Sequence, residues 1–99
     1  MEISDLVETI ANSHGRFDTF YFIMEDTNAR QIDYAVNCYG KQVSACEYPS
    51  SKITSHYTEN SEDAVAFLFD ADSHLWNLVS FEVSKDWYDL KIWTIKLQR

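Results

Sequence analysis

The chain has few of the residues that usually interrupt secondary structure, with two glycines and one proline in 99 residues. Disordered and low-complexity segments are rich in such residues and poor in aromatics, whereas Phe, Tyr and Trp make up 15 % of this chain. The composition therefore excludes a disordered chain. Its length and its 45 % hydrophobic content predict a single globular domain over residues 1–99.

Cysteine is also scarce, and two residues are too few for a disulfide framework or a cysteine-rich zinc site. Cys38 and Cys46 would lie well apart along a predicted hairpin, beyond the ~7 Å Cα separation that a disulfide tolerates. We expect both to be free thiols packed as small apolar residues. The sequence shows no signal peptide and no apolar run of membrane-spanning length, which predicts a cytoplasmic protein without membrane contact.

Basic residues are few: the chain has eight Lys and Arg but 16 Asp and Glu, which gives a formal net charge of −8. A field of this sign repels nucleic acid and anionic membranes and attracts basic proteins. The charge therefore argues against direct nucleic-acid binding and favours a basic protein as partner. The alternative is that the charge only maintains solubility.

Recognisable catalytic and cofactor motifs are missing from the sequence. It has no Gly-rich phosphate loop, no Gly-x-Ser-x-Gly nucleophile motif and no Cys/His zinc spacing. Asp70, Asp72 and His74 form an Asp-x-Asp-x-His run, but the Gly and Glu of a calcium loop are absent at the required positions. Turn formation is the simpler interpretation of this run. We therefore predict no metal, no cofactor and no enzymatic activity.

The first half of the chain predicts a helix that begins near residue 3. Ile3, Leu6 and Ile10 recur at helical spacing, Ser4 is a candidate N-cap, and Gly15 suits the left-handed position after a helix. The helix is short, so we expect it to gain its stability by packing its apolar side on a sheet.

Strands are predicted to follow this helix. Residues 17–25 are apolar on both faces, which is typical of a central strand or of one covered on both sides. Residues 31–38 then form a hairpin through a two-residue turn at Tyr39-Gly40, which places Val43 and Ala45 opposite Val36 and Tyr34. The polar segment 50–63 is expected to be a long loop with a short edge strand at residues 53–57.

Three apolar runs at residues 65–69, 75–83 and 90–97 are predicted to form an antiparallel meander. The segment 70–73 between the first two runs is rich in turn formers. A helix over residues 62–79, capped by Ser61, fits the same apolar spacing. The aromatic content and the turn-forming segment favour strands. The predicted fold is α+β, with one short N-terminal helix packed on an antiparallel sheet of about five to six strands and a second helix at 62–79 as the alternative.

The strongest candidate site is the connection between the last two predicted strands, where Trp87 and Tyr88 lie between Asp86 and Asp89. Trp and Tyr dominate the binding energy of many protein interfaces, and flanking carboxylates can meet Lys or Arg of a partner. In the alternative, Trp87 folds back as a lid on the sheet edge. The acids of the neighbouring predicted turn complete the candidate partner-binding set, which is Asp70, Asp72, Asp86, Trp87, Tyr88 and Asp89.

The chain is small and acidic, and it has an aromatic loop but no catalytic motif. These features together predict an inhibitor of a basic protein. The leading hypothesis is an immunity protein that binds and neutralises a basic nuclease-type bacterial toxin. The first alternative is a phage-encoded anti-defence inhibitor whose carboxylates mimic the phosphates of nucleic acid. The second is a domain that binds a small molecule between helix and sheet.

Overall fold

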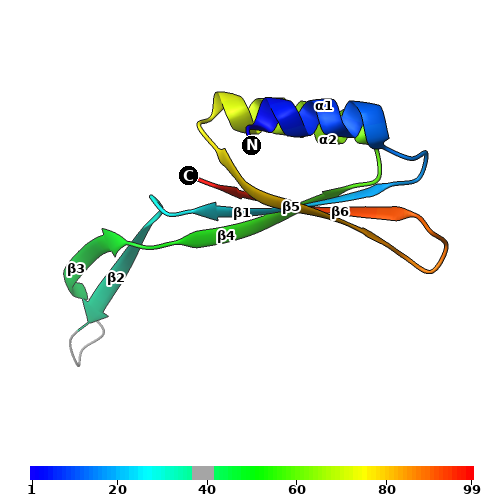
Figure 1. Ribbon diagram of the computed structural model, residues 1–99. Helices are drawn as coiled ribbons and strands as arrows, with labels where there is room; N and C mark the ends of the chain where they lie inside the picture. Colours follow the sequence, from blue (N-terminus) through cyan, green and yellow to red (C-terminus); the bar gives the residue numbers. More distant parts are fainter. Residues whose placement is uncertain (37–41) are drawn as a thin grey trace.

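The computed structural model describes the backbone of residues 1–36 and 42–99 and the side chains of residues 1–29 and 50–99. Within the described residues, two helices, α1 (Ile3–Ser13) and α2 (Ser61–Ser73), lie side by side on one face of a four-stranded sheet (Figure 1). The strands of this sheet are β1 (Thr19–Asp26), β4 (Lys52–Thr58), β5 (Asn77–Lys85) and β6 (Lys91–Gln98). The predicted α+β class is confirmed, with two helices rather than one.

A separate two-stranded sheet is formed by β2 (Arg30–Val36) and β3 (Gln42–Pro49), which extend beyond the larger sheet (Figure 1). Tyr34 pairs with Ala45, as predicted, but a register shift makes Gln42, and not Val43, the partner of Val36. The predicted turn at residues 39–40 and the thiols of Cys38 and Cys46 lie outside the described part of the structure. No helix in the described part of the chain is both long enough and apolar enough to cross a membrane.

The four-stranded sheet is mixed and has the order β4-β1-β6-β5. β1 is antiparallel to β4, and β5 is antiparallel to β6, but β1 and β6 run parallel. The prediction of an antiparallel sheet is therefore wrong at its centre. The reason is that the last strand of the chain enters the middle of the sheet beside the first, and such a long-range contact leaves no local pattern in the sequence.

Residues 65–73 belong to α2, so the predicted strand at 65–69 and the predicted turn at 70–73 are wrong. Asn60 caps this helix, because its side-chain oxygen accepts hydrogen bonds from the backbone N–H groups of Glu62, at 2.8 Å, and Asp63, at 3.2 Å. The helix ends at Ser73, and Leu75 with a φ of 66° turns the chain into β5. The alternative helix is thus present, but it ends before residue 79 and uses Asn60 rather than Ser61 as its cap.

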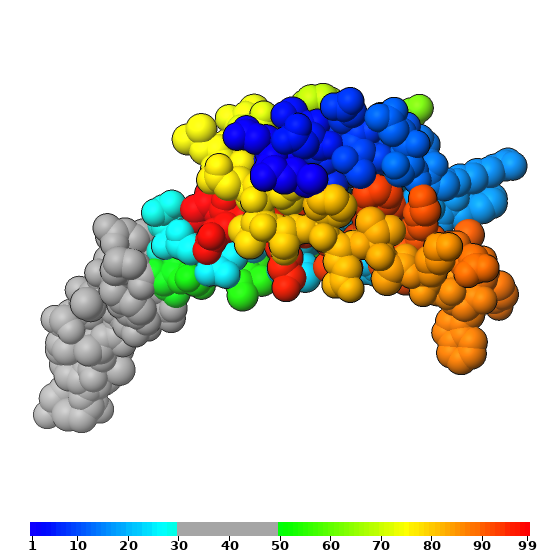
Figure 2. Space-filling model, in the orientation of Figure 1, coloured from blue at the N-terminus to red at the C-terminus, as the bar shows by residue number. Residues whose placement is uncertain are grey.

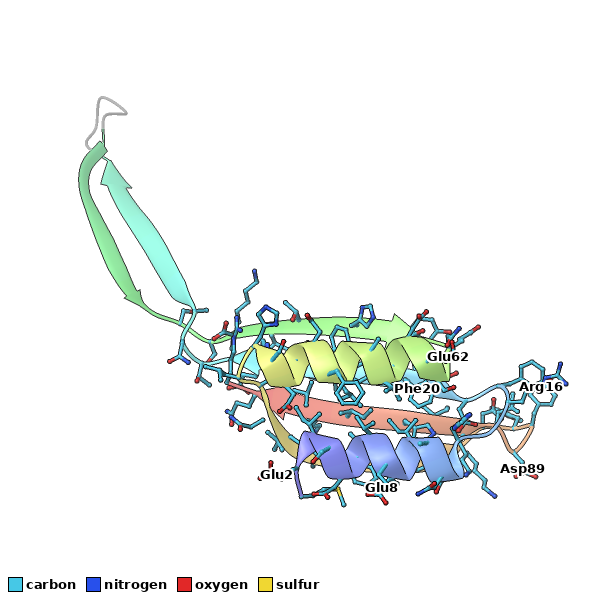
Figure 3. The ribbon with its side chains drawn as sticks, turned by 90° about the horizontal axis from the view of Figure 1, so that it is seen from above. Glu2, Glu8, Arg16, Phe20, Glu62 and Asp89 are labelled. Carbon is cyan, nitrogen blue, oxygen red and sulfur yellow. The ribbon has the colours of Figure 1, made fainter. Side chains whose placement is uncertain are left out.

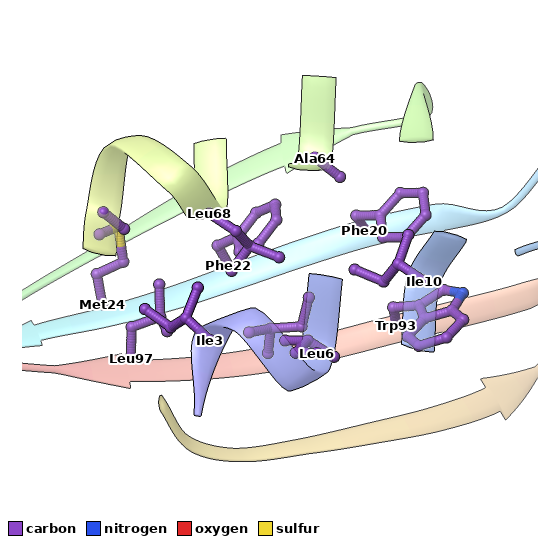
Figure 4. Packing of buried hydrophobic residues seen from close by; sticks show 12 residues of the cluster. Ile3, Leu6, Ile10, Phe20, Phe22, Met24, Ala64, Leu68, Trp93 and Leu97 are labelled. Carbon is purple, nitrogen blue, oxygen red and sulfur yellow. The ribbon is translucent and has the colours of Figure 1, made fainter. Parts of the chain in front are cut away.

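Buried apolar side chains fill the space between the two helices and the sheet (Figure 4). They come from one side of each helix and from alternate positions of the two central strands. The cluster comprises Ile3, Leu6, Ile10, Phe20, Phe22, Met24, Ala64, Leu68, Ala71, Trp93, Ile95 and Leu97. β1 therefore lies centrally, as predicted, but the helices cover only one of its faces.

The two ends of α1 differ from the predicted caps. The helix begins at Ile3, with Glu2 as the N-cap, and the Glu2 N–H donates to the Asp5 carboxylate at 2.9 Å, so Ser4 lies inside the first turn. At the other end, His14 is extended, and Gly15 does not take the predicted left-handed conformation.

Gly15 is required instead by a close contact with the buried side chain of Asp18. The Asp18 carboxylate accepts hydrogen bonds from the Gly15 N–H and from the Trp93 indole N–H, both at 2.8 Å. A Cβ on Gly15 would lie 2.7 Å from one of its oxygens. The bond from Gly15 closes the loop between α1 and β1 on itself, and the bond from Trp93 attaches this loop to the centre of the sheet.

We expect Gly15→Ala to lower the free energy of unfolding by about 1–3 kcal/mol, because the added methyl group displaces a buried carboxylate from its donors. Urea denaturation followed by tryptophan fluorescence measures the change. Ser13→Ala in the same segment is the control, since Ser13 is exposed, and its stability should stay within ~0.5 kcal/mol of the unsubstituted protein. Equal stability of the two variants would contradict this role of Gly15.

Candidate partner-binding surface

The turn between β5 and β6 holds its own shape through Asp86. The Asp86 Oδ1 atom accepts hydrogen bonds from the backbone N–H groups of Tyr88, at 2.8 Å, and Leu90, at 3.0 Å. The Asp86 N–H in turn donates to the Leu90 carbonyl at 2.9 Å, and Asp89 takes a left-handed φ of 61°. The carboxylate of Asp86 is thus committed to the turn, which presents its tip in a fixed conformation.

Trp87 and Tyr88 project from this turn into solvent. The exposed fractions of their side chains are 99 % and 83 %, so the alternative in which Trp87 covers the sheet edge is wrong. Figure 2 shows the orange segment that includes this turn standing out from the body of the molecule. Two large aromatic side chains on a fixed turn require no ordering of the backbone when a partner binds them.

Asp70 and Asp72 lie elsewhere, near the C-terminal end of α2. β5 runs from that end of the molecule to the turn that carries Trp87 (Figure 1), and its nine residues span roughly 25–30 Å at ~3.3 Å per residue. Asp70 is close to His74, with 3.6 Å between the Asp70 carboxylate and the His74 Nδ1 atom. The structure therefore divides the predicted partner-binding set into two groups at opposite ends of the sheet.

Three loops meet at the end of the molecule that carries the aromatic turn. We call this region the loop end and define it as residues 14–18, 59–62 and 86–90. Figure 3 shows Arg16, Glu62 and Asp89 together there, while Glu2 lies at the opposite end. The Lys91 ammonium donates a hydrogen bond to the Ser13 carbonyl and so connects the start of β6 to the end of α1.

The loop end contains apolar features that the sequence did not reveal. Phe17 is exposed there, with the Arg16 guanidinium carbon 5.3 Å from the centre of its ring. A groove of about 310 Å³ separates the end of α1 from the start of α2, and its lining consists of Ile10, Ala11, His14, Ser61, Glu62 and Val65. Most of its lining surface is apolar and Glu62 lies at its wall, so it can accept an apolar side chain beside an acidic group.

The charged residues on the outer surface of the helices are all acidic. Neither α1 nor α2 contains Lys or Arg, and the exposed carboxylates on them are Asp5, Glu8, Glu62, Asp63, Asp70 and Asp72. We call these six residues the acidic helix layer. The sequence shows the excess of acidic residues but not their location on the surface, because the pattern over residues 65–83 favours strands and α2 is a helix.

The chain matches no protein-family model, no curated protein and no solved structure.

Among the described residues, no group of three or more His, Cys, Asp or Glu side chains could hold a metal ion. The Nδ1 atom of His14 contacts the Ile10 carbonyl at 2.7 Å, and that of His74 contacts the Asp70 carbonyl at 2.8 Å. The His56 ring stacks on Phe67 with 4.4 Å between ring centres. Each histidine therefore has a structural contact in the fold.

Near the end of β4, the Tyr57 hydroxyl donates a hydrogen bond to the carboxylate of Glu59 in the loop end, which raises the pKa of Tyr57 to about 12. The neutral phenol is favoured in the folded state. The stability that this pair contributes is therefore present below pH 10.0, the ordinary tyrosine pKa, and is lost as the pH rises toward 12.

We expect Glu59→Gln to lower the pKa of Tyr57 toward its ordinary value of 10.0, because the charged acceptor is removed. A titration of phenolate absorbance measures this, and Tyr57→Phe identifies the phase that belongs to Tyr57. Identical titration curves for Glu59→Gln and the unsubstituted protein would show that the carboxylate does not control this hydroxyl.

Proposed function

We propose that this protein is a small acidic inhibitor that binds and neutralises a basic protein, as an immunity protein neutralises a nuclease-type bacterial toxin in the cytoplasm. The main support is Trp87, which is 99 % exposed on a turn that Asp86 fixes. Burying a Trp side chain removes 150–250 Å² of largely apolar surface from water, and such anchors dominate interface energies. The stability of the fold gives no reason for such a large apolar side chain to lie in solvent, whereas binding of a partner does.

The acidic helix layer supplies the charge that such a partner needs. Asp70 and Asp72 lie in the last turns of α2, where negative charge opposes the helix dipole and destabilises the helix. Helix stability therefore does not explain their presence, whereas attraction of a basic surface does. Six carboxylates without a nearby Lys or Arg on either helix would steer a positively charged protein toward this layer.

Inhibition by this route needs no chemistry on the inhibitor. The active-site cleft of a nuclease is basic because it binds phosphates. An acidic domain with a projecting aromatic turn can cover such a cleft and exclude the substrate. We infer that the loop end provides the apolar anchors and that the acidic helix layer provides the electrostatic attraction.

The same layer supports a second candidate, an anti-defence inhibitor that imitates nucleic acid. Its carboxylates follow the two antiparallel helices, neither of which contains Lys or Arg. Such an array could occupy a nucleic-acid channel directly. The identity of the bound protein distinguishes this candidate from a toxin immunity protein.

The test is capture of partners from native cells with the tagged protein, followed by washes at low and then high salt. We expect one basic protein to bind the unsubstituted chain, to bind Trp87→Ala/Tyr88→Ala poorly, and to be released by salt. Leu75→Ala is the matched control, because Leu75 is also an exposed apolar residue but lies at the opposite end. Equal capture by the double variant and the control would contradict the proposed role of the loop end.

A further inference from the structure

The face of the four-stranded sheet opposite the helices is not covered by either helix (Figure 1). Since Phe20, Phe22 and Met24 point into the core, the alternating residues of β1 lie on the open face. The strand register places neighbours from β4 and β6 beside them, and the rings of Tyr21 and Tyr57 are 5.0 Å apart. The large apolar residues of this face are Tyr21, Ile23, Ile53, Tyr57, Val79 and Ile92.

The charge on this open face differs from that on the helices. Its charged residues along the paired strands are Glu25, Glu82 and Lys96, and the Tyr57 hydroxyl holds the Glu59 carboxylate beside it. The face therefore combines a base with its acids and is less acidic than the helices. The acidic helix layer, in contrast, has six carboxylates and no Lys or Arg. Two molecules with a net charge of −8 repel each other least when their open faces meet and their helices point outward.

We propose that two copies of this chain associate through their open sheet faces. The product is a two-sheet sandwich with the helices on both outer surfaces, in which apolar side chains of the facing sheets pack at a sheet separation of about 10 Å. The shared face is self-complementary, because the acids of one copy can meet Lys96 of the other about a two-fold axis. Both acidic helix layers stay accessible in this dimer, and the turn between β5 and β6, which curves away from the helices (Figure 1), lies at the margin of the contact.

The area of the face is close to what a specific dimer needs. Four strands ~4.8 Å apart and about seven residues long at ~3.3 Å per residue cover roughly 450 Å² in projection. Two such faces with their side chains approach the roughly 1,000–1,200 Å² found at the low end of specific interfaces. We therefore expect a dimer whose population depends on protein concentration.

Sedimentation velocity over a range of protein concentrations, at low and high salt, tests this proposal. We expect a shift from monomer to dimer with increasing concentration, and a tighter dimer at high salt, because screening weakens the repulsion between two acidic copies. This salt response is opposite to that expected for binding of a basic protein.

The variant for this test is Ile53→Lys/Tyr57→Lys, which places like charges on the facing sheets while lowering the net negative charge. Both side chains are exposed on an edge strand, and circular dichroism checks that the variant is folded. We expect it to lower the fraction of dimer at least tenfold at a given concentration. Phe69→Lys, an equally apolar and exposed position on α2, should leave the dimer intact.

Two results would overturn the proposal. The first is a monomer at every concentration and salt level. The second is a dimer that survives the open-face substitutions, and its loss in Phe69→Lys would then place the contact on the helices.

Discussion

Replacing Trp87 with alanine is expected to weaken binding of the basic partner by about 30- to 1,000-fold, as for a central anchor of an interface. The free energy of unfolding should change by less than ~0.5 kcal/mol, because the side chain is fully exposed and contributes nothing to the core. Titration calorimetry with the captured partner measures the affinity, and urea denaturation measures the stability.

Two further variants make this result specific. Tyr88→Ala should weaken binding by a smaller factor, since its side chain is also exposed beside Trp87. Leu75→Ala should bind the partner as the unsubstituted protein does. If Trp87→Ala also bound with unchanged affinity, the aromatic turn would lie outside the interface, and the acidic helix layer alone would have to account for binding.

Replacing Leu68 with alanine should lower the free energy of unfolding by about 2–5 kcal/mol, because it leaves a cavity between α2 and the sheet. Leu68 is fully buried together with Ala64 and Ala71, one turn away on either side. Phe69→Ala at the next position should cost less than ~1 kcal/mol, since Phe69 is exposed. Urea denaturation of the two variants gives the comparison.

The comparison of Leu68→Ala with Phe69→Ala also distinguishes a helix from a strand in this segment. In the predicted strand over residues 65–69, Phe67 and Phe69 would share one face, so both would be expected in the core. In α2, the buried residues recur at helical spacing instead. A larger loss of stability in Phe69→Ala than in Leu68→Ala would contradict the helix.

The sequence predicts local elements of this fold better than their arrangement. The helix near residue 3, the central strand that begins at Thr19 and the antiparallel pair β5 and β6 follow from apolar periodicity within single segments. The sequence of α2 fits the apolar spacing of a helix and that of a strand, because Phe67, Leu68 and Phe69 are three consecutive apolar residues. The parallel pairing of β1 with β6 joins distant parts of the chain, so no local pattern indicates it.

In the candidate site, too, the local features can be predicted from the sequence and the long-range ones cannot. The aromatic turn is recognisable from Asp86 to Asp89 because its residues are contiguous. The groove between the helices and the exposed Phe17 depend on how three loops meet, which single-sequence patterns do not contain. The preference of Asp for turns predicts a hairpin at Asp70 and Asp72, whereas in the structure they are exposed carboxylates on a helix.

The most direct test of the proposed inhibition is a nuclease assay of the captured basic protein, with and without one equivalent of this chain. The proposal predicts that cleavage of nucleic acid falls to background at a one-to-one ratio and is restored when Trp87→Ala/Tyr88→Ala replaces the unsubstituted chain. A captured partner that is saturated with this protein but still cleaves nucleic acid at its full rate would contradict it.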